Sequence, residues 1–250
     1  RDTGEYSVQV TDNDTQIAVE SSTITISEEE DDDASFTQNT ISEQRGDIVE
    51  MTVAVESTDF ATISIGEDDG SEGVRANATV EDENGDGEVT VYLNTYQLGN
   101  DTANDEAFAT DDDSDDSVTD QQVEENTSDL IDAGNYDIQV MAGEEQYTAS
   151  SDGVATMVLE ERSTDALRMW TGSAEEISPS DLEDVNEAIE NGEITQSTEV
   201  AVGDFAVHQL EASGFEGALD ARANEDVTDS FLDLNRTGPI NLMIEEASPG

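Results

Sequence analysis

The sequence contains no cysteine and no lysine, and it has one histidine and three prolines in 250 residues. Without cysteine there are no disulfide bonds and no thiolate chemistry. With His208 as the single histidine, most acid–base and nucleophilic mechanisms lack the residues they need. Paired carboxylates could still catalyse hydrolysis, but acidic residues are so abundant that no particular pair stands out. We therefore expect a protein that is not an enzyme.

Positively charged residues are also scarce. Seven arginines face 64 acidic residues, which gives a formal net charge of -57. No basic patch can form to neutralise phosphates, so nucleic acid is excluded as a partner. Such self-repulsion favours expansion in dilute buffer, but the Debye length falls to about 3 Å at roughly 1 M salt. The composition indicates a halophile, with a disordered acidic chain as the alternative.

Long apolar runs are also missing. No stretch of about 18 apolar residues and no secretion signal occurs, so we expect no direct membrane insertion in this segment. The protein is then either cytosolic or an internal piece of a longer chain. The repeat described below favours the second interpretation.

What the sequence does contain is period-2 alternation of apolar and polar residues, which argues against the disordered alternative. Turn residues separate the alternating runs, and no proline lies inside them, as is typical of half-buried antiparallel strands. The runs include "STITIS", "DIVEMTVAV", "ATISIG", "GEVTVYLN" and "GVATMVLEE". We therefore predict an all-β fold of sandwich domains.

One motif occurs twice, as "DTGEYSVQV" at residues 2–10 and "DAGNYDIQV" at residues 132–140. Both resemble the tyrosine corner of immunoglobulin-like domains, in which a tyrosine hydroxyl bonds back to the backbone. The residues that carry this resemblance are Asp2, Tyr6, Asp132 and Tyr136. Val8 and Ile138 stand where antibody domains have a cysteine, so the core position is kept without the disulfide. Each copy is followed by one more strand pattern.

The repeat predicts tandem immunoglobulin-like β-sandwich domains in three modules. Residues 1–30 are expected to be the C-terminal strands of a truncated immunoglobulin-like domain, and residues 34–162 a complete one. Residues 163–250 are expected to form a third, β-rich module, either complete or incomplete. Two acidic stretches fit this division, since residues 28–33 are typical of a linker and residues 110–120 of a surface loop.

A single short helix is predicted near residues 180–191, in the third module. Ser180 is the expected cap, Glu183 completes a capping box, and Gly192 ends the helix. The expected packing face consists of Leu182, Val185 and Ile189.

Five Asn-x-Ser/Thr sequences predict sites of N-glycosylation. They are Asn13, Asn77, Asn100, Asn126 and Asn235. Three lie at predicted turns or loops, where a glycan is easily accommodated. Asn77 lies within a strand pattern and would have to point outward to carry one.

The stretch "DENGDGE" at residues 82–88 matches the first half of a calcium loop, with Asp82, Asn84 and Asp86 as ligands. An EF-hand is excluded, because its twelfth position is Leu93 and strand patterns flank the loop. The alternative is a hairpin turn whose Asn-Gly and Asp-Gly pairs accept positive φ. The Arg-Gly-Asp sequence at 45–47 is explained as a turn that starts the next strand.

The combination of these features resembles the S-layer (cell-surface) glycoproteins of haloarchaea. The stretches that carry the resemblance are "SFTQNTISEQRGDIVEMTVAVESTDFATISIGEDDG", "ENGDGEVTVYLNTYQLG" and "VHQLEASGFEGAL". The resemblance implies an extracellular array of immunoglobulin-like domains whose copies tile the cell in a two-dimensional lattice. It also implies N-linked glycans on the five asparagines and divalent cations, typically calcium, that bridge acidic surfaces.

From these features we predict a structural component of a halophilic archaeal surface layer. An adhesin or stalk-type binding module of another secreted halophilic surface protein would share the same architecture. An extracellular hydrolase with accessory sandwiches is a third possibility, and it would need a catalytic domain beyond these residues.

Overall fold

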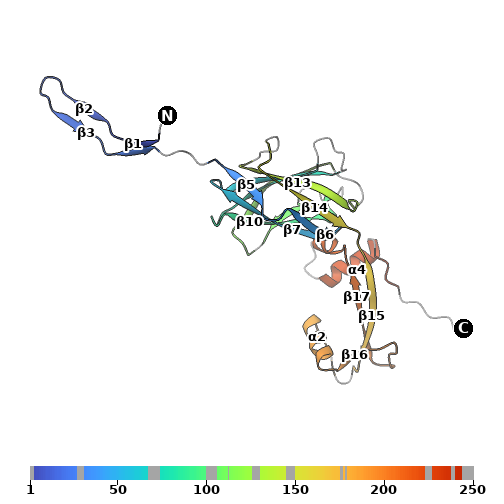
Figure 1. Cartoon of the computed structure of the whole chain (residues 1–250). Coiled ribbons are helices and arrows are strands. Elements are labelled where there is room, and N and C mark those ends of the chain that lie inside the picture. Colours follow the sequence, from blue (N-terminus) through green and yellow to red (C-terminus); the bar gives the residue numbers. More distant parts are fainter. Residues whose placement is uncertain are drawn as a thin grey trace.

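The protein is described here by a computed structural model. The described residues are 3–26, 31–66, 74–99, 106–111, 113–125, 130–144, 150–174, 177, 179–222, 227–237 and 240–243. They form three parts along the chain, which we call the N-terminal hairpin, the sandwich and the C-terminal unit (Figure 1).

The N-terminal hairpin consists of four short strands. Strand β1 (Gly4–Tyr6) pairs with β4 (Ile24–Ile26), and β2 (Gln9–Thr11) pairs with β3 (Ala18–Glu20), both antiparallel. Its turn is closed by the side chain of Asp12, which accepts hydrogen bonds from the backbone of Asp14 and Thr15. Figure 1 shows the hairpin as an arm apart from the two large sheets.

The sandwich consists of a four-stranded and a six-stranded sheet. The first has the order β11-β10-β7-β5 and is formed by β5 (Asp33–Phe36), β7 (Ile48–Glu56), β10 (Glu88–Asn94) and β11 (Phe108–Thr110). The second has the order β12-β9-β8-β13-β14-β6 and is formed by β6 (Thr40–Gln44), β8 (Phe60–Ile65), β9 (Arg75–Glu81), β12 (Ser117–Glu125), β13 (Gly134–Ala142) and β14 (Gly153–Glu160). Neighbouring strands are antiparallel, except for the parallel pair β6 and β14. The all-β prediction is confirmed, and the immunoglobulin-like topology stays a prediction.

The core lies between these two sheets and follows the alternation seen in the sequence. On β7, for example, Val49, Met51, Val53 and Val55 are buried and the residues between them are more exposed. Each fully buried side chain of this kind stabilises the fold by about 1.5–3 kcal/mol. Because the chain has no cysteine, packing of the two sheets is the main source of stability.

The C-terminal unit is smaller and mixes strands with helices. Its sheet has the order β16-β15-β17 and is formed by β15 (Thr164–Gly172), β16 (Ile194–Gln196) and β17 (Phe205–Ala212). Its helices are α2 (Leu182–Glu190), α3 (Glu216–Asp220) and α4 (Val227–Thr237). A further helical turn, α1 (Thr95–Leu98), follows β10 in the sandwich. The prediction of one helix was therefore too low. None of the helices in the described part of the chain is long and apolar enough to cross a membrane.

Helix α2 forms at the predicted place, but its start and its packing face differ from the prediction. The cap is Asp181, whose side chain accepts from the backbone of Asp184, while Ser180 donates from its backbone and hydroxyl to the Asp184 carboxylate. The helix packs through Ala188, which is buried, whereas Leu182 is 74% exposed. The predicted face was wrong at Leu182 because this residue occupies the first helical position, beyond the edge of the packed surface.

The two acidic stretches have different places in the fold. Asp111 and residues 113–116 connect β11 to β12 within the sandwich, as the loop prediction required. Of the expected linker, residues 28–30 lie outside the described residues, and Asp33 already belongs to β5. The module boundaries at 30, 34 and 162 stay predictions.

Candidate functional site

The most strongly built polar site in the described residues joins the sandwich to the C-terminal unit. We call it the joint, and it is centred on Arg45, Gly46 and Asp47 in the turn between β6 and β7. Asp47 is 8% exposed, and its two carboxylate oxygens accept hydrogen bonds from the backbone N–H groups of Gly214 and Glu216, at 2.7 and 2.9 Å. Since α3 begins at Glu216 and has no side-chain cap of its own, an acidic residue of the sandwich caps a helix of the next unit. This placement matches the preference of helix N-termini for negative charge.

Three glycines allow the backbones of the two parts to approach one another at the joint. Gly46 accepts a hydrogen bond at its carbonyl from the N–H of Gly217, at 2.9 Å. A Cβ atom on Gly46 would lie 2.5 Å from the carbonyl oxygen of Gly214, and one on Gly214 would lie 2.7 Å from the carbonyl oxygen of Arg45. Gly46 and Gly214 also have φ of +94° and +81°, which glycine adopts without strain. Larger residues at these two positions would separate the two units.

Asn94, at the end of β10, connects the joint to the sandwich. Its side-chain oxygen accepts from the backbone of Tyr96 and Gln97, so that it caps α1. Its side-chain nitrogen donates to the carbonyl of Gly217 at 2.9 Å and to the carboxylate of Asp220 at 3.1 Å. One side chain that is 4% exposed thus holds a helix of each part.

Two of the seven arginines lie at the joint. The Arg45 guanidinium pairs with Asp132 at 3.3 Å and with Glu161 at 3.2 Å. The Arg162 guanidinium lies over the ring of Phe215, 5.8 Å from its centroid. Both acidic partners of Arg45 are solvent-exposed, so these pairs contribute less than the buried hydrogen bonds of Asp47.

The joint is a structural contact that holds the two parts together. Its buried contacts are short hydrogen bonds to backbone groups, which molar salt screens much less than it screens exposed ion pairs. The sequence had placed a turn at residues 45–47, and the positive φ of Gly46 confirms it. The partners at Gly214, Gly217 and Asp220 were missed. The only signal for them was the Ser-Gly-Phe sequence that precedes α3, which shows a turn but not its distant partner.

An acidic cavity of about 770 Å³ lies beside the joint, between the first sheet and α3. Its acidic lining residues are Glu43, Glu50, Glu106, Asp111, Asp113, Glu216 and Asp220. Burial of Tyr92 on its wall, together with the charges of Glu50 and Asp111, raises the pKa of the Tyr92 phenol above its usual value. The negative charge of its lining attracts cations and repels anions, in keeping with the exclusion of nucleic acid.

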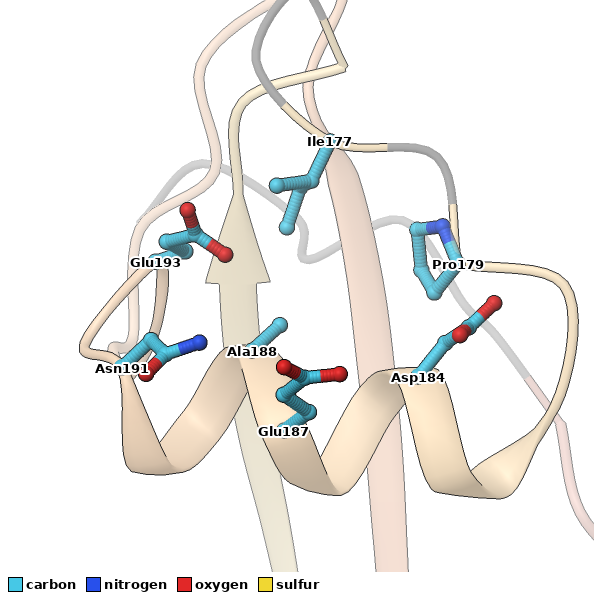
Figure 2. A pocket seen from close by; sticks show the side chains of 7 residues that line it. All are labelled: Ile177, Pro179, Asp184, Glu187, Ala188, Asn191 and Glu193. Atoms are coloured by element: carbon cyan, nitrogen blue, oxygen red, sulfur yellow. The ribbon is translucent and has the colours of Figure 1, made fainter.

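A second acid-lined hollow, of about 390 Å³, lies against α2 (Figure 2). Its floor includes Ala188, and Ile177 lies opposite on the chain segment before the helix. Its carboxylates come from Asp184, Glu187 and Glu193. Hydrogen bonds from the backbone and hydroxyl of Ser180 lower the pKa of the Asp184 carboxyl, so this group is already engaged in holding the start of the helix.

The predicted calcium ligands Asp82, Asn84 and Asp86 lie in the tight turn between β9 and β10. The two Asp82 oxygens accept from the backbone of Gly85 and Gly87, at 2.7 and 2.8 Å. Asn84 and Asp86 each accept from the backbone two residues further on. Gly85 and Gly87 have positive φ, as expected for the alternative hairpin turn. Within the described residues, no three acidic, histidine or cysteine side chains gather around a common point, and calcium at these three residues stays a prediction.

Asp116, in the acidic stretch at residues 110–120, lies against this turn. Its carboxylate accepts from the side-chain nitrogen of Asn84 at 3.1 Å. Burial, followed by the negative charges of Asp82 and Asp86, raises the pKa of the Asp116 carboxyl. The turn is therefore a place where like charges are held together by hydrogen bonding.

The five predicted glycosylation sites have different environments. Asn13 is exposed at the tip of the N-terminal hairpin. Asn235 is half-buried in α4, and its side-chain oxygen accepts from the backbone of Leu242. Asn77 is 3% exposed in β9, and its side-chain oxygen accepts from the Ser64 hydroxyl at 2.6 Å. The requirement that Asn77 point outward is thus not met. Asn100 and Asn126 lie outside the described residues.

The two copies of the tyrosine motif also differ. The hydroxyl of Tyr136 donates to the carbonyl oxygen of Asp132 at 2.7 Å, and its ring is 5% exposed. This is the backbone contact that the motif predicted. In the first copy Tyr6 is 44% exposed, and Asp2 lies outside the described residues.

Fold and joint together define a class of mostly β protein, in which a β-sandwich and a smaller unit of strands and helices meet through a buried polar contact. Along its whole length the chain is homologous to cell surface glycoproteins of haloarchaea, which confirms the resemblance predicted from the sequence.

It is 41% identical over 254 residues to the cell surface glycoprotein of Haloferax gibbonsii. It is 35% and 34% identical to cell surface glycoproteins 1 and 2 of Haloarcula hispanica. These matches cover 99–100% of the chain but only 27–28% of each relative, so the chain spans about a quarter of their length. Residues 26–143 also match a domain family of unknown function, DUF7827. No solved structure matches the chain at a significant level.

Proposed function

We propose that the chain is a non-enzymatic, extracellular segment of a haloarchaeal surface layer, a glycosylated protein coat built from copies of one polypeptide in a two-dimensional lattice. The names of its relatives support a cell-surface role. The observation that carries the mechanical part of the proposal is the joint, in which Asp47 caps a helix of the next unit. A lattice needs modules that meet at a constant angle, and the joint provides such a contact.

The high negative charge implies a second property of the coat, namely that divalent cations hold its copies together. At a net charge of -57, neighbouring copies repel each other, and divalent cations bound between acidic surfaces would offset that repulsion. The acidic cavity beside the joint and the turn at Asp82 are the places where such cations, most simply calcium, would be held. N-linked glycans on the exposed asparagines would complete the outer surface.

The test uses the full-length protein in its native host. Electron micrographs of cell envelopes should show an ordered array, and EDTA at constant molar NaCl should loosen it, with restoration by added Ca²⁺. Magnesium added back at the same concentration is the control for cation identity. A protein that is sparse on the cell and forms no array would instead be an adhesin or stalk. An array that survives EDTA unchanged would remove the cation-bridging part alone.

A further inference from the structure

An early strand of the sandwich, β6, and its last strand, β14, pair in parallel. Strand β6 lies at the edge of the six-stranded sheet, and the register of the pair runs from Thr40 opposite Thr156 to Gln44 opposite Glu160. The other neighbouring strands of the sandwich are antiparallel. Because the two strands run in the same direction, the chain enters β6 at one end of the pair and leaves β14 at the other end. An antiparallel pair would place both points at the same end.

Backbone hydrogen bonds hold this pair along its whole length. At one end, the N–H of Thr156 donates to the carbonyl oxygen of Asn39 at 3.1 Å. At the other end, the N–H of Arg45 donates to the carbonyl oxygen of Glu160 at 3.0 Å. On the inner side of the sheet, Ile41 of β6 is buried in the sandwich core, so water has little access to the bonds from that side. The pair is therefore a continuous ladder that is closed by a hydrogen bond at each end.

Tension along the polypeptide would load this ladder in shear. The N-terminal hairpin and the C-terminal unit lie at opposite ends of the sandwich (Figure 1). A pull on the hairpin reaches the start of β6 through β5, and a pull on the C-terminal unit reaches the end of β14 through residues 161–163. Because the strands are parallel, the two pulls act in opposite directions along the ladder, and its hydrogen bonds must break together. A pull at one end of an antiparallel hairpin would break them one after another.

We propose that β6 and β14 form a mechanical clamp, through which the sandwich bears tension transmitted along the polypeptide. Parallel pairing is slightly less stable per residue than antiparallel pairing, so the distinguishing property of this pair is the direction in which it resists force. Forced unfolding is governed by the rate of unfolding and not by the equilibrium free energy. The inference does not depend on lattice formation, because a stalk would carry tension along the chain in the same way as a coat.

Single-molecule force spectroscopy of the whole chain in molar NaCl tests the clamp. The sequence has no cysteine, so pairs of introduced cysteines place the two handles at chosen residues. Handles at Asp32→Cys and Glu161→Cys pull β6 and β14 in opposite directions, whereas handles at Asp132→Cys and Glu161→Cys unzip the antiparallel pair β13 and β14 from one end. The first pair of handles should give a severalfold higher rupture force and release about 40 nm of chain, as expected for roughly 120 residues at about 3.5 Å each. Equal rupture forces for the two pairs of handles would overturn the inference.

A pair of proline variants in β6 tests the ladder itself. The N–H groups of odd-numbered residues face β14, as that of Arg45 does, whereas the N–H of Gln44 faces away and donates to the Glu43 carboxylate. Glu43→Pro therefore removes a donor of the clamp, and Ser42→Pro removes an N–H on the open edge of the sheet.

With the first pair of handles, Glu43→Pro should lower the rupture force by at least about one sixth, since a parallel pair of this length has about six evenly spaced hydrogen bonds. Ser42→Pro should leave the rupture force nearly unchanged. Equal forces in the two variants would show that the resistance does not come from β6 and β14. If Glu43→Pro is not obtained as folded protein, the comparison of the two pairs of handles still decides between the outcomes.

Discussion

The carboxylate of Asp47 accepts a hydrogen bond from the backbone N–H of Gly214 at 2.7 Å, across 167 positions of sequence. A side chain of the sandwich thereby fixes the start of α3 in the C-terminal unit. The bond is buried, so its loss would leave polar groups that water cannot easily satisfy. This relationship makes Asp47 the most informative residue to change.

Substitution of Asp47 by asparagine should destabilise the contact between the two parts. The asparagine presents an N–H₂ group to one of the two backbone donors, so one hydrogen bond is lost and a charged acceptor becomes neutral. We expect a loss of about 1.5–3 kcal/mol, typical of a hydrogen bond to a charged group. Calorimetry in molar NaCl should show the C-terminal unit melting earlier than the sandwich. Asp137→Asn removes an equal charge from an exposed position of β13 and should leave both transitions in place.

Substitution of Gly46 by alanine should open the joint. The new Cβ would lie 2.5 Å from the carbonyl oxygen of Gly214, in addition to the cost of positive φ for a side chain. Gly203→Ala separates the two effects, because Gly203 has φ of +102° and no atom within 4 Å of the added Cβ. Small-angle scattering should show an altered arrangement of the two parts for Gly46→Ala alone. An unchanged scattering profile for both variants would show that close backbone approach is not what holds the joint.

The sandwich could be predicted from the sequence because its strands bury every second residue. Val49, Met51 and Val53 are visible as a pattern without knowledge of any partner. The corner at Tyr136 could be predicted for the same reason, since its hydroxyl contacts Asp132 only four residues away. The spacing of residues within a short stretch of sequence is therefore enough to predict both the strands and the corner.

The joint could not be predicted, because its contacts connect residues that no local pattern relates. Asn94 donates to the carbonyl of Gly217, a backbone atom 123 positions further on, and any residue type could have supplied that carbonyl. The burial of Asn77 was missed for a similar reason. A polar residue on a strand suggests an outward position, but Asn77 is covered and is hydrogen-bonded by Ser64 of the neighbouring strand.

Removal of the Tyr136 hydroxyl tests the corner without changing the packing of the ring. Tyr136→Phe should lower the unfolding free energy by about 1 kcal/mol, the usual contribution of one such hydrogen bond. Denaturant titration in molar NaCl would measure the difference. Tyr92→Phe, on a half-buried ring at the acidic cavity, is the comparison and should cost less. A Tyr136→Phe midpoint equal to that of the natural protein would show that the corner is not stabilising.

The carboxyl of Asp116 should make the stability of the protein depend on pH in a direction that can be predicted. Its carboxyl has a pKa raised above the ordinary value of 3.8, so the folded state holds this proton more tightly than the unfolded state. The stability that this proton provides is complete below pH 3.8 and is lost as the pH rises through the raised pKa. Asp116→Asn retains an acceptor for Asn84 and removes the charge. It should therefore raise the melting temperature at neutral pH but not at pH 3.

A change in NaCl concentration distinguishes the two causes of the raised pKa of Asp116, which are burial and repulsion by neighbouring carboxylates. Repulsion from Asp82 and Asp86 is screened by NaCl, whereas burial is not. The gain in melting temperature from Asp116→Asn should shrink between low and molar NaCl, within the range in which the protein stays folded. Asp59→Asn, an exposed position at the same end of the sandwich, should give no gain at either concentration. A gain that is independent of salt would assign the raised pKa to burial alone.

Glycan occupancy in the native host should follow exposure and not the sequence motif. Asn13 lies on an exposed turn, where an oligosaccharide meets only solvent, whereas Asn77 is 3% exposed and has its side-chain oxygen bonded to Ser64. Mass spectrometry of proteolytic peptides should find sugar on Asn13 and an unmodified Asn77. The paired variants give the reciprocal result, since Asn13→Gln should lose a glycan without loss of stability and Asn77→Gln should lose stability without loss of a glycan. Sugar on Asn77 would mean that β9 is not covered in the mature protein, and a bare Asn13 would remove the hairpin tip as a glycan site.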